Sequence, residues 1–167
     1  QREHKKFLEN NSNISFIKDS YLQYNRIDPN KKFENFILGF SNKLAFEASK
    51  KVSEDISHYN PLYIYGGVGM GKTHLLNAIG LDLKEKSKVM FISAERFMYQ
   101  FVRSIKLNEM VKFKEYFRNT DVLIIDDIQF MNGKEAMQEE FFHTFNALLD
   151  KGSQIIISAD RPPNKLS

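Results

Sequence analysis

Short apolar runs alternate with longer amphipathic segments over residues 61–158. The short runs are rich in β-branched and aromatic residues, which favours strands, and the amphipathic segments repeat their apolar residues at helical spacing. Strands are predicted at residues 61–65, 89–92, 122–125 and 154–158. Helices are predicted at residues 73–86, 95–106, 108–118 and 135–150. This alternation predicts a parallel sheet with helices on both faces, which is a three-layer α/β fold.

The same pattern predicts which side chains are buried. The strand at 122–125 is apolar on successive residues, as in a strand that is covered on both faces. Before the first strand, Ser41 is a candidate cap for a further helix. The apolar stripe of that helix is predicted to consist of Leu44, Ala45, Ala48, Val52 and Ile56. The core-facing residues of the helix at 135–150 are predicted to be Met137, Phe141, Phe145 and Leu148.

Composition excludes several classes of protein. The chain of 167 residues has the length of one domain, and it contains no cysteine, which excludes a disulfide scaffold and a thiolate metal site. No apolar run approaches the roughly 18 residues of a membrane span, and the start of the chain lacks the apolar region of a signal peptide. A cytoplasmic location is therefore expected. The net charge of +3 permits nucleic-acid binding without arguing for it.

A glycine-rich motif follows the first predicted strand. Residues 66–73, with the sequence GGVGMGKT, fit the P-loop pattern between a strand and a helix. Glycines let the backbone approach an anion closely, and the helix N-terminus favours negative charge. Lys72 is expected to reach the β- and γ-phosphates and Thr73 to ligate Mg²⁺. The alternative is a glycine-rich turn that binds nothing. The residues expected to bind ATP or ADP here are Gly67, Val68, Gly69, Met70, Gly71, Lys72, Thr73 and His74.

Two acids follow the predicted strand at 122–125. Ligands of open α/β sheets bind at the carboxyl ends of the strands, so Asp126 and Asp127 are expected beside the P-loop. Asp126 is the expected metal-side acid of a Walker B motif, and Asp127 is expected to polarise the attacking water. The alternative is a helix-capping or surface pair of acids. The next strand ends in Ser158-Ala159-Asp160-Arg161, and a polar residue here could sense the γ-phosphate if that strand lies between the other two.

The chain resembles the DnaA family of bacterial chromosomal replication initiators, which are AAA+ ATPases. The resemblance covers about residues 25–167. The segments that carry it are Asn60-Pro61-Leu62, GGVGMGKTHLLNAIG, IIDDIQFMNGKE, QEEFFHTFNALLDKG and SADRPP. It implies that the strand after Walker B inserts between the Walker A and Walker B strands, which makes Asp160 the sensor 1 residue. Residues 28–39 resemble the segment that lies against adenine, which implicates Phe33, Phe36 and Ile37; the alternative is that these three residues pack in the core.

The resemblance also implies a role in DNA binding. The helical insertion between the second and third strands matches the motif through which such domains form an open helical filament and line a channel for single-stranded DNA. Val102 and Lys134 match positions that face this DNA, whereas Ala136 stands where an arginine often adds a contact. From charge alone, a basic run is more often a solvated face. The basic residues of the insertion are Arg103, Lys106, Lys112, Lys114 and Arg118.

Domain boundaries follow from these motifs. Residues 1–28 are polar and weakly periodic, which predicts a linker, and residues 29–167 are expected to form the AAA+ nucleotide-binding subdomain. The chain does not begin with Met, and it is expected to be part of a longer protein that is cut before the fifth strand. The family's arginine finger, its helical lid with sensor 2 and its double-stranded DNA-binding domain are expected downstream. Alone, this piece should be a weak, Mg²⁺-dependent ATPase.

The function predicted on this basis is that of an ATP-dependent replication initiator. ATP would switch assembly into a filament that opens the chromosomal origin and holds single-stranded DNA. The partners implied by the resemblance are origin DNA, further copies of the same protein, the replicative helicase and acidic phospholipids. Two alternatives are a shorter paralogue that regulates initiation and an AAA+ helicase loader. A metabolic P-loop kinase fits less well, since no substrate pocket is evident.

Overall fold

The computed structural model describes residues 27–36, 42–54, 59–67 and 71–161. Of the predicted linker at residues 1–28, residues 1–26 lie outside these residues. The predictions for Ile37, Ser41 and Ile56 and for the loop residues Val68, Gly69 and Met70 also lie outside them. Within the described residues, no helix is long and apolar enough to cross a membrane.

A parallel sheet of four strands forms the centre of the described chain. The strands are β1 (Leu62–Tyr65), β2 (Val89–Ser93), β3 (Val122–Asp126) and β4 (Gln154–Ala159). Their order across the sheet is β1-β4-β3-β2, so β4 lies between the Walker A strand and the Walker B strand. This order confirms the arrangement that the resemblance implies. The register pairs Ser93 with Asp126 and Tyr65 with Ala159, which brings the carboxyl ends of all strands to one edge.

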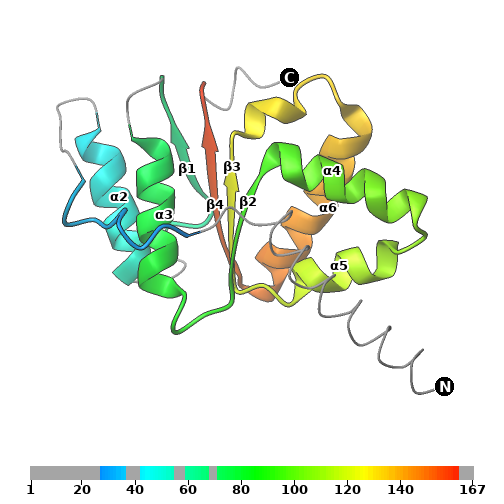
Figure 1. Cartoon of the computed structure of the whole chain (residues 1–167), viewed down its shortest axis with the longest axis horizontal. Helices are drawn as coiled ribbons and strands as arrows, with labels where there is room; N and C mark the ends of the chain where they lie inside the picture. Colours follow the sequence, from blue (N-terminus) through cyan, green and yellow to red (C-terminus); the bar gives the residue numbers. More distant parts are fainter. Residues whose placement is uncertain (1–26, 37–41, 55–58, 68–70, 162–167) are drawn as a thin grey trace.

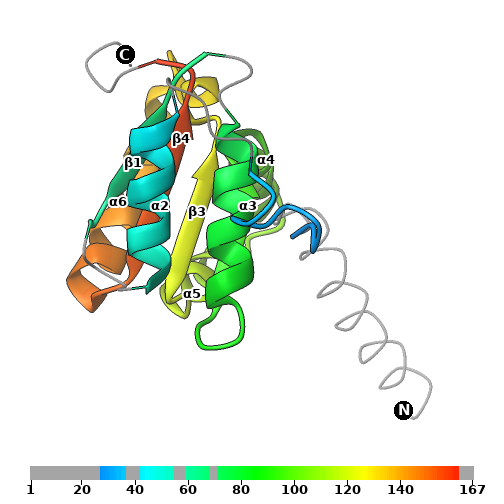
Figure 2. The ribbon, with the colours of Figure 1, turned by 90° about the vertical axis from the view of Figure 1, so that its left-hand side faces the viewer.

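Helices cover both faces of this sheet, which confirms the predicted three-layer fold (Figures 1 and 2). One face carries α2 (Lys43–Glu54) and α3 (Lys72–Leu83). The other face carries α4 (Ala94–Lys106), α5 (Met110–Arg118), α6 (Glu135–Lys151) and the short 3₁₀ helix η1 (Ile128–Met131). The sequence did not predict η1. It begins directly after Asp127, whose left-handed backbone (φ 59°) turns the chain away from β3.

Each face of the sheet has its own hydrophobic core. On the α3 side, Leu75 and Ile79 pack with Ile124, whereas on the α6 side the aromatic rings of Phe97, Phe117 and Phe141 form the centre. Residues of β3 alternate between the two cores, and all five are buried. The prediction that this strand is covered on both faces is therefore confirmed, as is the core-facing stripe of α6.

One predicted core position is wrong. The side chain of Leu44 is 80% exposed, although the pattern placed it on the buried stripe of α2. Residues on a helix are about 100° apart, and the stripe that meets the sheet is formed by the i, i+3, i+4 and i+7 positions 45, 48, 49 and 52. Leu44 lies to one side of this stripe. The buried Ser49, which the apolar pattern does not include, occupies the stripe instead.

Candidate nucleotide site

The first turn of α3 forms one wall of the site. Gly71 precedes the helix with a left-handed backbone (φ 85°), and no side chain caps the helix. Its first turn carries no acidic residue of its own, and its N-cap offers no side-chain oxygen to the backbone N–H groups there. Such an N-terminus suits an anion. The Lys72 ammonium donates a hydrogen bond to the Gly66 carbonyl oxygen, which places the ammonium beside the residue that follows β1.

Asp126, the predicted metal-side acid, contacts this turn through Thr73. The Thr73 hydroxyl donates to Asp126 Oδ2 at 3.3 Å, and the Ser158 hydroxyl donates to Asp126 Oδ1. Asp126 is only 4% exposed, and this burial raises the pKa of its carboxyl group. The hydrogen bond from Ser158 opposes the rise, and the adjacent charge of Asp127 adds to it. The structure therefore brings together Thr73 and Asp126, the two residues predicted to serve a metal ion.

Asp127 is held by two polar side chains. Its backbone N–H donates to Ser158 Oγ at 3.0 Å, and its carboxylate oxygen Oδ1 accepts a hydrogen bond from Gln129 Nε2 at 3.3 Å. The other end of the Gln129 amide, Oε1, accepts from the Asp160 N–H at 3.2 Å. Asp127, the predicted water-polarising acid, is thus linked to Asp160, the predicted sensor, through one side chain.

Asp160 follows β4 directly and is exposed. Its carboxylate is paired with Arg161 at 2.6 and 3.0 Å, and the hydrogen bond from Arg161 lowers the pKa of Asp160. The positive charge of Lys72 acts to lower the pKa of both Asp126 and Asp160, against the larger effect of burial at Asp126. Lys72 is therefore close enough to both carboxylates to interact with them electrostatically.

Residues 27–36, here called the leading segment, are tied to α3 by polar contacts. Asn77 accepts a hydrogen bond from the Asp28 N–H at 2.7 Å and donates to the Asp28 and Lys31 carbonyl oxygens at 2.7 and 3.2 Å. One turn earlier on the helix, His74 Nε2 lies 2.7 Å from the Lys32 carbonyl oxygen. The leading segment is therefore fixed along the helix that starts at the P-loop.

This attachment brings Phe36 to the P-loop. The ring of Phe36 stacks on Phe46 at 5.4 Å and meets His74 edge-on at 5.2 Å, and its edge lies over the Cα of Gly71. Phe33 instead is buried in the core beneath it. A cavity of about 300 Å³ opens between the leading segment and α2 and α3. It is lined by Phe33, Glu34, Phe36, Phe46, Lys50 and Asp82.

A known protein family matches most of the chain, including the motifs described above. The family model for the bacterial DnaA ATPase domain matches residues 27–167. The chain belongs to the DnaA family. The family predicted from the sequence motifs is thereby confirmed.

Individual members of the DnaA family are close in sequence and structure. The chromosomal replication initiator protein DnaA of Wolbachia pipientis wMel is 47% identical over 95% of the chain and 37% of that relative. A structure of the replication initiator DnaA bound to AMPPCP and single-stranded DNA has a TM-score of 0.82 at 43% identity, covering 86% of the chain and 46% of its own. Domain III of Thermotoga maritima DnaA has a TM-score of 0.82 at 45% identity, covering 86% and 61%. The chain spans about a third of the length of the curated relatives it matches.

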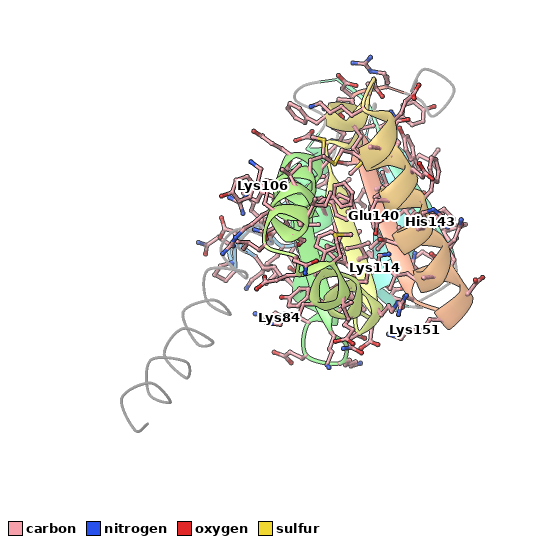
Figure 3. All side chains as sticks on the ribbon, turned by 90° about the vertical axis from the view of Figure 1, so that its right-hand side faces the viewer. Lys84, Lys106, Lys114, Glu140, His143 and Lys151 are labelled. Carbon is pink, nitrogen blue, oxygen red and sulfur yellow. The ribbon has the colours of Figure 1, made fainter. Side chains whose placement is uncertain are left out.

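The two residues that the resemblance predicts to face DNA come from elements next to η1. Val102 is half-buried on α4, and Lys134 is exposed directly before α6; both helices pack against η1. The outer surface of α4 and α5 adds exposed apolar residues, among them Tyr99 and Val111, to the exposed lysines Lys106 and Lys114 (Figure 3). Ala136, which replaces the frequent arginine, is exposed in the first turn of α6.

Sequence reasoning missed two residues that organise the site. Neither Gln129 nor Asn77 is predicted as a site residue, because a polar residue inside a helical or turn segment gives no periodic signal. Each makes a contact with a residue far away in the chain: Gln129 with Asp160, 31 positions away, and Asn77 with Asp28, 49 positions away. A signal was present at Asn77, where an amide interrupts an otherwise apolar helix face that is buried at almost every position.

Proposed function

We propose that this domain binds ATP and ADP with Mg²⁺ and uses the γ-phosphate as a switch for assembly during replication initiation. One observation carries the proposal: the P-loop residue Thr73 is hydrogen-bonded to the buried acid Asp126 at the carboxyl edge of a parallel sheet. The DnaA structure with AMPPCP and single-stranded DNA, at 43% identity, supports the same assignment for this chain.

The donor set suits Mg²⁺. The Thr73 hydroxyl and the Asp126 carboxylate are hard oxygen donors, and Mg²⁺ usually takes one or two such protein ligands together with phosphate oxygens and water. Within the described residues, no group of three or more acidic, histidine or cysteine side chains forms a separate metal cage. When bound, Mg²⁺ would neutralise charge on the β- and γ-phosphates. Thr73 and Asp126 would hold it.

The remaining side chains divide the work on the nucleotide. Lys72, the N-terminal turn of α3 and the loop residues 67–71 would bind the phosphates. Asp127 would polarise the attacking water and Asp160 would respond to the γ-phosphate. Phe36 and Ile37, with His74 and Phe33 behind them, would form the adenine side of the site, since the leading segment places Phe36 over the P-loop.

The DNA-binding role belongs to a different surface. We assign contact with single-stranded DNA to Val102 on α4 and to Lys134, which directly precedes α6; both helices pack against η1. Assembly would use the basic and apolar outer face of α4 and α5. Contacts with the helicase, with acidic phospholipids and with double-stranded origin DNA would belong to the whole protein. The family assignment favours this function over that of a helicase loader.

Capture of labelled single-stranded DNA by the whole protein that contains this domain tests the proposal. With ATP, capture should exceed that with ADP, and it should weaken steeply as salt rises, because phosphate contacts release counterions. Lys134→Ala with Val102→Ala should reduce capture and leave ATP affinity unchanged. Lys86→Ala is the matched control, since Lys86 is an exposed lysine between α3 and β2, at the opposite edge of the sheet. Equal capture by mutant, control and parent would contradict the DNA assignment.

A further inference from the structure

The side-chain amide of Gln129 bridges the two residues that the proposed function makes responsible for hydrolysis and for sensing. Its Nε2 donates to the Asp127 carboxylate at 3.3 Å, and its Oε1 accepts from the Asp160 backbone N–H at 3.2 Å. Gln129 belongs to η1, Asp127 ends the turn after β3, and Asp160 follows β4. One half-buried side chain thus connects the carboxyl ends of two neighbouring strands.

Chemistry fixes the direction of this bridge. A carboxylate only accepts hydrogen bonds and a backbone N–H only donates them, so the amide must present its NH₂ group to Asp127 and its oxygen to Asp160. Rotating the amide by 180° would set oxygen against oxygen and N–H against N–H. A rotated amide would therefore lose both hydrogen bonds together, and this couples the two ends of the bridge.

The backbone around Gln129 is held firmly. Phe130 N–H donates to the Asp127 carbonyl oxygen at 3.1 Å, and Asn132 N–H donates to the Gln129 carbonyl oxygen at 3.0 Å. The neighbouring side chains of Ile128 and Met131 are buried in the core. Ser158 Oγ fixes the Asp127 backbone from the other side. A side chain on so constrained a turn can orient a carboxylate with little loss of rotamer entropy.

We propose that Gln129 is a positioning residue that couples the orientation of the Asp127 carboxylate to the position of Asp160. This inference rests on the proposed function, in which Asp127 polarises water and Asp160 responds to the γ-phosphate. When Asp160 shifts, the hydrogen bond from its N–H to Gln129 Oε1 changes. The Gln129 side chain then moves, which weakens or strengthens the hydrogen bond from its Nε2 to the Asp127 carboxylate. The bridge therefore acts on turnover rather than on nucleotide affinity.

Amide NMR of the chain itself tests the bridge without any hydrolysis. In Gln129→Ala, the Asp160 amide proton should move upfield and exchange with solvent several-fold faster, because its acceptor is gone. Gln138→Ala is the matched control: Gln138 is also half-buried, but its amide donates to the Met131 carbonyl oxygen. Asp127→Ala should move the Asp160 signal in the same direction, and should do so only while Gln129 is present. An Asp160 amide that is unaffected by Gln129→Ala would overturn the bridge.

Gln129→Glu separates the two ends of the bridge. A glutamate can still accept from the Asp160 N–H, but when ionised it has no hydrogen to donate to Asp127. In the whole protein, kcat for ATP should fall about tenfold or more in both Gln129→Glu and Gln129→Ala, since misorienting a catalytic group is costly. The Kd for ATP should be unchanged, and the fall in kcat should disappear in an Asp127→Asn background.

The outcomes distinguish this inference from the proposed function. A lowered ATP affinity in Gln129→Ala, or an equal fall in kcat with and without the Asp127 carboxylate, would show that Gln129 supports the fold and does not act through Asp127. Failure of the chain to bind nucleotide at all would overturn the proposed function and leave the NMR result on the bridge standing.

Discussion

Asn77 and Asp28 form a closed pair of hydrogen bonds: Asn77 Oδ1 accepts from the Asp28 N–H and Asn77 Nδ2 donates to the Asp28 carbonyl oxygen, both at 2.7 Å. The side-chain amide pairs with the backbone as a neighbouring strand would. Asn77 is 3% exposed and sits on the helix that begins at the P-loop. Asn77 therefore ties the leading segment to the helix whose first turn lies at the P-loop.

Asn77→Ala should loosen this attachment. The change leaves the half-buried Asp28 N–H without its acceptor and removes one donor from each of the Asp28 and Lys31 carbonyl oxygens, of which the Asp28 oxygen keeps the Lys31 N–H. A buried group left unsatisfied costs about 1–3 kcal/mol. The free energy of unfolding should fall by about 2 kcal/mol or more, and ATP affinity should fall with it. Tripolyphosphate, which lacks adenine, should bind as before. Asn146→Ala, an exposed helical position on α6, is the control and should cost nothing, since alanine favours helices. Chemical denaturation and calorimetry provide both readouts.

Gly71→Ala should harm the P-loop through Phe36. A Cβ at residue 71 would lie 2.6 Å from Phe36 Cε2, and the backbone there is left-handed with φ 85°. Gly133→Ala meets the same kind of backbone strain, at φ 74°, with no atom within 4 Å of the added Cβ. Strain alone costs roughly 1–2 kcal/mol. Thermal unfolding should show a larger loss for Gly71→Ala than for Gly133→Ala, and only Gly71→Ala should weaken nucleotide binding. Equal losses would mean that Phe36 does not constrain the loop.

Asp126→Asn should stabilise the chain in the absence of Mg²⁺ and nucleotide. Because burial raises the pKa of Asp126 in the folded state, the folded chain keeps this proton to higher pH than the unfolded chain does. The contribution of Asp126 to the free energy of unfolding therefore falls as pH rises from the unfolded to the folded pKa, and the penalty is complete above the folded value. Asparagine can still accept from Ser158. The melting temperature of Asp126→Asn at pH 7 should exceed that of the parent, and the gap should close at acidic pH.

Adding Mg²⁺ with ATP should reverse this order, because asparagine lacks the charge that holds the metal. Ser49→Ala serves as a control for changes in a buried polar side chain away from the site. If the parent chain melts at a higher temperature than Asp126→Asn at pH 7 without ligand, the ionised Asp126 does not destabilise the folded chain.

Asp127→Asn should separate binding from chemistry. The amide keeps the size of the side chain and an oxygen that accepts from Gln129, but it loses the charge that polarises water. Nucleotide affinity should remain, while turnover in the whole protein should fall roughly 10²-fold or more, the usual contribution of a general base. Single-turnover hydrolysis of radiolabelled ATP measures the effect. Unchanged turnover would make Asp127 a structural residue.

The sequence predicts most of this fold because its strands are unusually clear. Apolar runs such as Ile155-Ile156-Ile157 are readily recognised as buried strands. Asp126 and Asp127, at the end of β3, must then lie at the carboxyl edge of a parallel sheet. The strand order came only from the family resemblance, since spacing alone does not show that β4 inserts beside β1. Leu44 is wrongly predicted to be buried, because it lies one position outside the stripe and hydrophobicity alone does not distinguish it from the stripe residues.

Polar contacts between distant residues set the limit of prediction. Gln129 lies 31 residues from Asp160, and Asn77 lies 49 residues from Asp28. Neither pairing leaves a period or a motif in the chain. The left-handed backbone of Asp127 also could not be predicted from the sequence, because the surrounding hydrogen bonds impose it. This conformation directly precedes η1, the helix that carries Gln129.

Calorimetric titration of Lys72→Ala with ADP tests the central claim, that this P-loop binds nucleotide phosphates. The ammonium of Lys72 is the cation beside the turn, and a charge-assisted hydrogen bond contributes roughly 1.5–3 kcal/mol. We predict that ADP affinity falls about tenfold to a hundredfold. Lys84→Ala, an exposed lysine at the far end of the same helix, should bind as the parent does. An ADP affinity in Lys72→Ala equal to that of the parent would contradict the assignment of this site.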